Sequence, residues 1–407
     1  MKKITLIAAV AALSVAAFGL APAGAKDDSK PSQLKCSPDV CKALEAAQKL
    51  TAAGDFRTAL DQLKGAQALP KRTPDDDYLI DELMAAAAIR ANDMATATAA
   101  FEGMANSPLL DQDPAKVTVL ANVMIVENVS KNYAKTIAYG QKLQAIQPLD
   151  DKQLASLCEA YYFTKDYAHV RQIGAQVLAE SKSRGTIPPE GILQMVMNAD
   201  LDAGDKQGAF DVSEQLAVDY NVPSDWARVI DISLAQKGTP TDALNLLRLG
   251  VVTGASLDAS DYNLMGDIAM RAAFYGDAET AARHGGKAPG VAAKVAADRK
   301  ELPGLIAAAK NQDAKHNIVL AQDLYGYGRY AEAEELARAA LAKGGPAGEA
   351  NMVIGMSQAG QGKFADAVGT FQQVNGDPEM KVGAHLWALY AQRKANPPAA
   401  AAAPATH

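Results

Sequence analysis

The imidazole of histidine supplies many of the general bases and metal ligands in enzymes. The chain of 407 residues contains five histidines: His169, His284, His316, His385 and His407. None belongs to an H-E-x-x-H pair or lies at metal-ligand spacing from another histidine or a cysteine. Their placement predicts no metal site, and for His169 and His284 it predicts surface or helix-capping roles.

Other catalytic signatures are also missing from the sequence. A serine nucleophile would need an elbow such as G-x-S-x-G, and none is present. There is no P-loop. Gly326-Tyr327-Gly328 partly matches a glycine-rich nucleotide-binding loop, but it follows a predicted helix, so a hairpin turn explains it. The sequence therefore predicts a protein that is not an enzyme, with no catalytic residue and no cofactor.

One acidic run, Asp75-Asp76-Asp77, has two interpretations. It has the carboxylates of a Ca²⁺ loop, but it lacks the alternating ligands and the distant glutamate of an EF-hand. The favoured interpretation is an N-cap and a first-turn charge for the helix that runs through Leu79 and Leu83.

The cysteines predict structural roles. Cys36 and Cys41 flank Ser37 and Pro38, a good N-cap and a good first helical residue. We expect a local disulfide that fixes the start of the first helix, and the alternative is a redox or metal-binding pair, although the spacing is not C-x-x-C. Cys158 is interpreted as a small buried residue, with a reactive thiol as the alternative.

The first 25 residues have the layout of a secretory signal peptide. Lys2 and Lys3 precede an apolar run from residue 4 to 20, and Ala23-Gly24-Ala25 fits a small-x-small cleavage site. We expect cleavage after Ala25 and a periplasmic or secreted mature chain, because the lysine-led, alanine-rich leader has a bacterial appearance. The alternative is an uncleaved anchor, but no later segment is apolar over a spanning length, so the mature form is expected not to span a membrane.

The net charge of the chain limits the classes of partner that it is expected to bind. Removing the leader takes away two lysines, which leaves 38 basic against 47 acidic residues and a net charge near −9. An acidic chain without a Lys/Arg stripe argues against nucleic acid and against anionic membrane surfaces as partners.

The elements that would position any site are helical hairpins. Residues 318–378 hold the same 34-residue unit twice, with Gly328-Arg329-Tyr330 and Gly362-Lys363-Phe364 at matching places. A period near 34 predicts an α-solenoid, in which each helix pair buries its apolar face against its neighbours. The same Gly/aromatic/Ala turn can be followed back along the chain, with predicted turns at Gly54, Asn92, Asn132, Asp166, Gly204, Gly238 and Gly276.

One interval breaks the period. The step from Gly276 to Gly328 is 52 residues, which predicts an extra helix within 291–310, bent at Pro303-Gly304. The predicted organisation is a signal peptide at 1–25, a flexible N-terminus at 26–34, repeats one to seven at 35–290, an irregular junction helix at 291–312, repeats eight and nine at 313–394 and a disordered Pro/Ala-rich tail at 395–407.

This pattern closely resembles the tetratricopeptide repeat family. Small residues stand nine positions before the turn aromatic, where the two helices of a hairpin approach closely: Ala47, Cys158, Ala321 and Gly355. The resemblance covers about residues 35–394 and implies an all-α, right-handed α-solenoid of about nine antiparallel helix pairs. It also implies that peptides or proteins bind in the groove lined by the first helix of each pair. The Lys/Asn carboxylate clamp of the family's chaperone-tail binders is absent at the matching positions.

Groove residues follow from the resemblance by their offset from each turn. The predicted partner-binding residues are Lys152, Glu159, Tyr162, Phe163, Asn198, Arg228, Met270, Phe274, Gln322, Tyr325 and Met356. Tyr162 and Phe163 are surplus to the packing pattern, and exposed aromatic and methionine side chains are typical binding anchors. The alternative is that irregular repeats bury these residues against each other.

We expect a non-enzymatic periplasmic scaffold or adaptor that binds an extended segment of another protein of the bacterial envelope. Two alternatives stay open: a carrier or receptor for a small ligand held inside the superhelix, and an accessory domain of an enzyme complex. A content of 6% aromatic residues is low for a dedicated small-molecule pocket.

Overall fold

The computed structural model describes residues 34–113, 115–236, 238–374 and 377–397. Within these ranges the chain forms twenty α-helices and two short 3₁₀ helices, without strands, which confirms the all-α prediction. Two compact units divide at residues 199 and 200. The predicted leader at 1–25, the predicted flexible start apart from Leu34, and the predicted tail from residue 398 onward lie outside the described residues.

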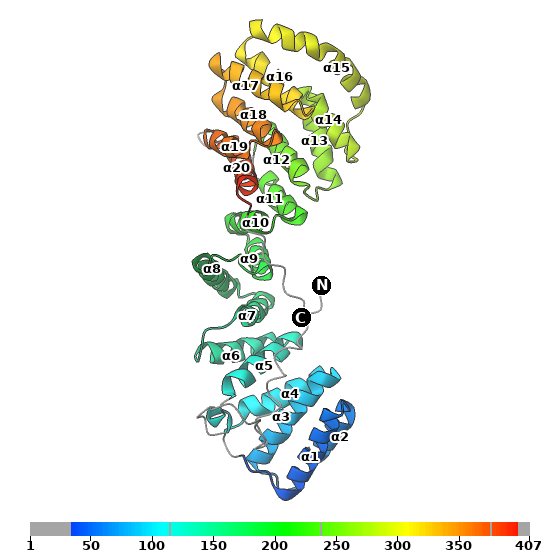
Figure 1. The fold of residues 1–407 in the computed structure, drawn as a ribbon, viewed down its shortest axis with the longest axis vertical. Coiled ribbons are helices and arrows are strands. Elements are labelled where there is room, and N and C mark those ends of the chain that lie inside the picture. Colours follow the sequence, from blue (N-terminus) through cyan, green and yellow to red (C-terminus); the bar gives the residue numbers. More distant parts are fainter. Residues whose placement is uncertain (1–33, 114, 237, 375–376, 398–407) are drawn as a thin grey trace. The chain divides into compact units, whose positions relative to one another are not determined.

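The first unit consists of consecutive helical hairpins, as Figure 1 shows. Its helices are α1 (Pro38–Ala52), α2 (Phe56–Gln67), α3 (Pro74–Ala91), α4 (Met94–Asn106), η3 (Leu110–Gln112), α5 (Lys116–Val129), α6 (Tyr133–Gln144), α7 (Asp151–Phe163), α8 (Tyr167–Arg184) and α9 (Glu190–Ala203), whose last residues belong to the second unit.

The turns explain why these hairpins form. Asp55, Asp93 and Asp166 each precede the second helix of a pair, and each accepts a hydrogen bond from the backbone N–H three residues ahead. At the first turn Gly54 has a φ of 83°, a left-handed conformation that reverses the chain at little steric cost. The small residue before the turn is buried, as Ala47 and Cys158 show. Burial raises the pKa of the Cys158 thiol to about 12, which suits a packing role.

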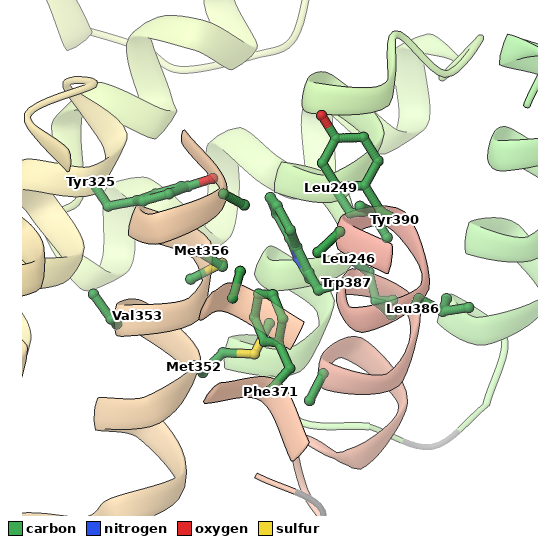
Figure 2. Packing of buried hydrophobic residues seen from close by; sticks show 14 of the residues in the cluster. Leu246, Leu249, Tyr325, Met352, Val353, Met356, Phe371, Leu386, Trp387 and Tyr390 are labelled. Atoms are coloured by element: carbon green, nitrogen blue, oxygen red, sulfur yellow. The ribbon is translucent and has the colours of Figure 1, made fainter. Parts of the chain in front are cut away.

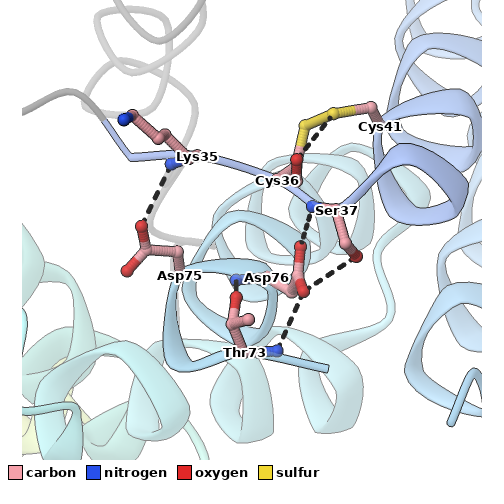
Figure 3. Close-up of a disulfide and its surroundings, with 7 residues drawn as sticks. All are labelled: Lys35, Cys36, Ser37, Cys41, Thr73, Asp75 and Asp76. Atoms are coloured by element: carbon pink, nitrogen blue, oxygen red, sulfur yellow. Dashed lines mark hydrogen bonds between the residues drawn. A yellow bond between two sulfur atoms is a disulfide. The ribbon is translucent and has the colours of Figure 1, made fainter. Parts of the chain in front are cut away.

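The N-terminal segment is fixed by a disulfide and a buried carboxylate (Figure 3). The Sγ atoms of Cys36 and Cys41 are bonded at the start of α1. Asp76 accepts hydrogen bonds from Ser37 N at 2.7 Å, from Ser37 Oγ at 3.0 Å and from Thr73 N at 2.8 Å. Thr73 caps α3, and its hydroxyl accepts from Asp76 N. The middle aspartate of the acidic run therefore joins α1 to α3 and completes the cap. The run lies in the first turn of α3, as expected, but the N-cap residue is Thr73 and not an aspartate.

We expect the Asp76→Ala variant to lower the free energy of unfolding of the first unit by about 2–3 kcal/mol, because the part-buried donors of Ser37 and Thr73 lose a charged acceptor. Urea unfolding followed by far-UV circular dichroism measures this loss. Asp77→Ala is the matched control, since Asp77 is exposed and pairs with Arg72 at the surface; its change should stay within about 0.5 kcal/mol. Equal effects of the two substitutions would contradict the role given to Asp76.

The same carboxylate predicts a pH dependence. Burial acts to raise the pKa of Asp76, but the hydrogen bonds from Thr73 and Ser37 outweigh it and lower the pKa below its usual value. A lowered folded-state pKa means that the stabilisation is present above the unfolded pKa of about 3.9 and is lost as the pH falls through the folded value. The contribution of Asp76 should therefore persist at pH 5 and disappear during acid unfolding.

The second unit contains eleven complete α-helices and η4 (Ala309–Asn311) within the described residues. The α-helices are α10 (Lys206–Tyr220), α11 (Pro223–Leu234), α12 (Pro240–Thr253), α13 (Ala259–Ala272), α14 (Tyr275–Arg283), α15 (Val291–Ala308), α16 (Ala314–Gly326), α17 (Tyr330–Ala342), α18 (Ala347–Gly360), α19 (Phe364–Gln372) and α20 (Lys381–Ala395).

The extra helix predicted in the long interval is α15, which continues through Pro303. The seventh turn lies at Ala273 and Phe274, three residues before the predicted position at Gly276. Gly276 instead lies inside α14, where an added Cβ would come within 2.4 Å of the Gly326 backbone. That glycine therefore permits α14 and α16 to approach closely, and it does not form the turn.

Helix α12 is the centre of the second unit. Its residues from Asp242 to Gly250 are almost all buried, and the helix contacts α11, α13 and the C-terminal helix α20. Trp387 of α20 is fully buried and donates from Nε1 to the carbonyl oxygen of Asn245 on α12 at 2.9 Å. Figure 2 shows Trp387 beside Leu246 of α12 and Phe371 of α19. The chain of this unit thus packs back onto its own central helix.

Candidate functional site

The predicted groove residues divide into two groups by burial. Phe274, Gln322, Tyr325 and Met356 are buried, whereas the others are exposed or half-buried: Lys152, Glu159, Tyr162, Phe163, Asn198, Arg228 and Met270. All four buried residues belong to the second unit. The expectation that they line an open groove is therefore wrong.

The physical reason is a polar network that fills the interior of the second unit. Arg248 of α12 donates from Nε and Nη2 to the Asp277 carboxylate at 3.1 and 2.6 Å, and from Nη1 to Gln322 Oε1 at 3.3 Å. Its guanidinium carbon lies 5.0 Å from the Tyr325 ring centre and 5.7 Å from that of Phe274. Three of the four buried residues therefore surround one arginine.

That arginine remains charged. Burial acts to lower the pKa of Arg248, but the Asp277 charge and its hydrogen bonds raise it above the usual value. Met356, the fourth buried residue, belongs to the same apolar cluster as Trp387 (Figure 2). These side chains stabilise the second unit internally and are not available to a partner.

An aromatic surface remains at the ends of α5 and α7 in the first unit. We define it by Val129, Tyr133, Tyr162 and Phe163. The Phe163 ring is 54% exposed and stacks on the Tyr133 ring, with 4.9 Å between ring centres and 12° between planes. Tyr162 meets Phe163 edge-on at 5.5 Å. Val129 at the end of α5 is 50% exposed. This geometry offers an ordered apolar face without a closed pocket.

Polar groups border the aromatic surface. Glu159, one turn before Phe163 on α7, accepts a hydrogen bond from Asn128 Nδ2 at 2.8 Å. Burial, and then the charge of Glu159, raise the pKa of Tyr133 above its usual value, so the phenol stays protonated at neutral pH. Lys131 and Lys165 occupy the left-handed turn positions after α5 and α7, each with a φ of 62°, and both are exposed. A bound segment would therefore meet apolar rings between a carboxylate and two lysines.

The structure brings together only part of the predicted set. Glu159, Tyr162 and Phe163 share one end of α7. Lys152 lies on the same helix but eleven residues before Phe163, which is about 16 Å along the helix axis. Asn198 lies on α9, and Arg228 and Met270 lie on α11 and α13 of the second unit. Lys152 and Asn198 therefore lie elsewhere in the first unit, and Arg228 and Met270 belong to the second unit.

Two members of the surface were not predicted as binding residues. Val129 lies three residues before the cap residue Asn132, as Phe163 lies three residues before Asp166. Val129 could therefore have been predicted as a binding residue from the sequence, because it has the same position relative to its turn as Phe163. Tyr133 occupies the turn position that the repeat assigns to packing, but here its ring supports Phe163.

Two further properties bear on the class of protein. Within the described residues, no group of three or more His, Cys, Asp or Glu side chains is placed to hold a metal ion. No helix in the described ranges is both long and apolar enough to cross a membrane.

Comparison with known proteins gives structural similarity only. No family model matches the chain, and no curated protein sequence matches it. Among solved structures, it is similar to a tetratricopeptide repeat protein from Parabacteroides merdae, with a TM-score of 0.31 and 11% identity over 79% of this chain and 99% of the other. The P58(IPK) TPR domain matches with a TM-score of 0.25 and 13% identity over 88% of this chain and 98% of that domain.

Yeast Tom70 matches with a TM-score of 0.23 and 11% identity, over 88% of this chain and 96% of the other. Because these TM-scores are low, the repeat architecture rests on the helical hairpins described above. The aromatic surface likewise stands on its own geometry.

Proposed function

We propose that this chain is a non-enzymatic protein-interaction scaffold that binds an extended segment of another protein at the aromatic surface of the first unit. The observation that carries the proposal is the 54% exposed Phe163 ring stacked on Tyr133. Fully burying a phenylalanine side chain stabilises a complex by roughly 1.5–3 kcal/mol. A partner that covers this ring with an apolar or aromatic side chain would gain about half of this contribution, because about half of the Phe163 surface is still exposed.

Preorganisation supports the same proposal. Stacking on Tyr133 and the edge contact with Tyr162 hold the Phe163 ring in one orientation. A side chain that is already ordered loses less conformational entropy on binding than a mobile one. Aromatic residues in such positions often carry a large share of the binding free energy.

The proposed location is the periplasm or another secreted compartment, with envelope proteins as partners. The signal-peptide pattern that ends at Ala25 supports this proposal. The disulfide between Cys36 and Cys41 adds support, because such bonds persist in oxidising compartments.

The test uses a photo-crosslinking phenylalanine analogue at position 163 in cells of the source organism. The matched control carries the analogue at Leu264, which is 39% exposed and lies on α13 of the second unit. We expect one specific protein to crosslink at position 163 and not at position 264. The same products at both positions, or none at position 163, would contradict the proposal.

Once that partner is purified, Phe163→Ala should weaken its binding by about tenfold or more, which is the range of a binding anchor. Phe163→Tyr should keep most of the affinity, because the stacked ring is retained. The melting temperature should change little, since the ring is exposed. An unchanged dissociation constant for Phe163→Ala would show that the aromatic surface does not bind this partner.

A further inference from the structure

The second unit contains a cleft between α15, α16 and the turn from α13 to α14. Its volume is about 500 Å³, and its lining includes Tyr275, Asp298, Leu305, Val319 and Asp323. The helix that forms one wall is α15, the extra helix outside the regular repeat. The cleft lies far along the chain from the aromatic surface, and nothing in the proposed function uses it.

The walls of the cleft are apolar. Leu305 of α15 and Val319 of α16 are each 45% exposed, and they line the same cleft with Ala308 and Leu320. Large side chains of this kind are usually buried in a protein interior. Their joint exposure in one concave site suits a ligand with an apolar body.

Two carboxylates from different helices lie at this site. Asp323 of α16 is buried and accepts a hydrogen bond at Oδ1 from the backbone N–H of Tyr275 at 3.1 Å. Asp298 of α15 lies close enough to interact with it directly. The Oδ2 atom of Asp298 is buried and makes no hydrogen bond of good geometry, although this carboxylate is near enough to raise the pKa of the Tyr327 hydroxyl. This buried oxygen is thus left without a well-placed donor.

The two carboxylates interact unfavourably with each other, although the charge of Arg248 also acts on Asp323. Burial, then the charge and hydrogen bond of Asp298, and finally the charge of Asp277 raise the pKa of Asp323 to about 8. Two carboxylates in contact do not both ionise easily. Asp323 is therefore the carboxyl that takes up a proton most readily at this site.

We propose that this cleft binds a ligand with a primary ammonium group on an apolar chain, with the ammonium at Asp298 and Asp323 and the chain along Leu305 and Val319. The ammonium supplies three hydrogen-bond donors for the carboxylate oxygens. A divalent metal is a poorer fit, because it requires more oxygen ligands than two carboxylates, and the walls are apolar. The ammonium belongs either to a free amine or to a lysine side chain of a protein segment.

The distance between Lys315 and Asp323 along α16 determines which charged group a ligand can carry at the end away from its ammonium. Lys315, Val319 and Asp323 are four residues apart, so they share one face of the helix. The distance along the axis from Lys315 to Asp323 is about 12 Å. Lys315 and His316 also line the cleft and are exposed. A second ammonium at that end would be repelled by Lys315, whereas a carboxylate there would be attracted.

The test is isothermal titration calorimetry of the whole mature chain with four six-carbon probes. Hexylamine and 6-aminohexanoate should bind, 1,6-diaminohexane should bind at least fivefold more weakly than 6-aminohexanoate, and hexanoate should not bind. A peptide with one lysine between leucines distinguishes the sources: binding of the peptide alone would assign the ammonium to a protein segment. Absence of binding by hexylamine, 6-aminohexanoate and the peptide would overturn the proposal, as would equal binding of hexanoate.

Two variants locate the site. Asp298→Asn keeps the shape of the side chain, and it should weaken hexylamine binding at least tenfold. Val319→Lys changes an exposed residue and places a cation in the cleft, so it should abolish binding even if Asp298→Asn disturbs folding. Far-UV circular dichroism checks that both variants fold. Unchanged affinity in the folded variants would overturn the assignment.

The pH dependence is an independent readout. The groups that face Asp323 are Asp298 on α15, Asp277 and the backbone N–H of Tyr275 on α14, Arg248 on α12 and the hydroxyl of Tyr327. An ammonium favours the ionised form of Asp323, so its binding should release the proton that Asp323 carries. Affinity should rise between pH 6 and pH 8, and the binding heat should vary with the ionisation heat of the buffer. Affinity that falls with pH over this range would contradict the placement of the ammonium.

Discussion

Replacing Asp277 with alanine should lower the free energy of unfolding of the second unit by about 3–5 kcal/mol, which is the range for breaking a buried ion pair from one side. Arg248 is only 2% exposed, and Asp277 supplies two of its hydrogen bonds. Without that carboxylate, the guanidinium stays buried with two neutral acceptors, Asn245 Oδ1 and Gln322 Oε1, and one backbone carbonyl, that of Gln322. These acceptors do not neutralise its charge.

The two tryptophans of the chain make this loss measurable in one unit. Trp226 and Trp387 are the only ones in the sequence, and both are fully buried in the second unit. Tryptophan fluorescence during urea unfolding therefore reports on the second unit and leaves the first unit silent. The expected result for Asp277→Ala is a transition at clearly lower urea concentration.

A surface pair of the same chemistry provides the matched control. Arg271 and Asp267 on α13 are bonded at 2.9 Å but are exposed to solvent. Asp267→Ala should change the stability by no more than about 0.5 kcal/mol, as is usual for exposed pairs. The double variant Arg248→Met and Asp277→Leu should regain much of the loss, because no buried charge remains. If Asp277→Ala were as mild as Asp267→Ala, the buried network would not stabilise the second unit.

The second large effect is expected for Trp387→Ala, with a loss of about 3–5 kcal/mol in the same unit. Trp387 has no exposed surface, and its ring lies 5.9 Å from those of Phe371 and Tyr390. Its removal leaves a cavity between α12, α19 and α20. Trp226 remains as the fluorescent reporter for urea unfolding, since it is also buried in this unit.

Trp387→Phe separates packing from hydrogen bonding. The phenylalanine keeps most of the ring but loses the donor to the Asn245 carbonyl oxygen. The expected loss is about 1–2 kcal/mol, because one buried hydrogen bond between α20 and α12 is lost. A loss for Trp387→Ala no larger than that for Trp387→Phe would show that α20 does not close the interior of the unit.

These two results bear on where a partner can bind. An open groove in the second unit would tolerate truncation of its inward side chains, whereas a packed interior would not. Tyr325, predicted as a groove residue, lies against Arg248 in that interior. Loss of Tyr325 should therefore lower stability, and loss of Phe163 should lower binding. The aromatic surface that we propose as the binding site belongs to the first unit, and the cleft proposed to bind an ammonium group lies beside the extra helix α15 in the second unit.

Much of the fold could be predicted from the sequence because the hairpin is specified locally. The glycine and aspartate of a turn act within four residues of each other, as Gly54 and Asp55 show. The extra helix α15 was predictable for the same reason, since it appears as a break in a regular spacing. The exposed Phe163 was predictable as an aromatic residue that the repeat does not need.

Only the tertiary structure decided which faces remain open. The sequence of α12 reads like the second helix of an ordinary pair, although its run of leucines around Arg248 is apolar on nearly all sides. A repeat unit encodes its contact with the next unit, and small rotations between units then add up along the chain. In the second unit these rotations return α20 to α12, which fills the space where a groove was expected. Such closure depends on the sum of many interfaces, so no single repeat carries its signal.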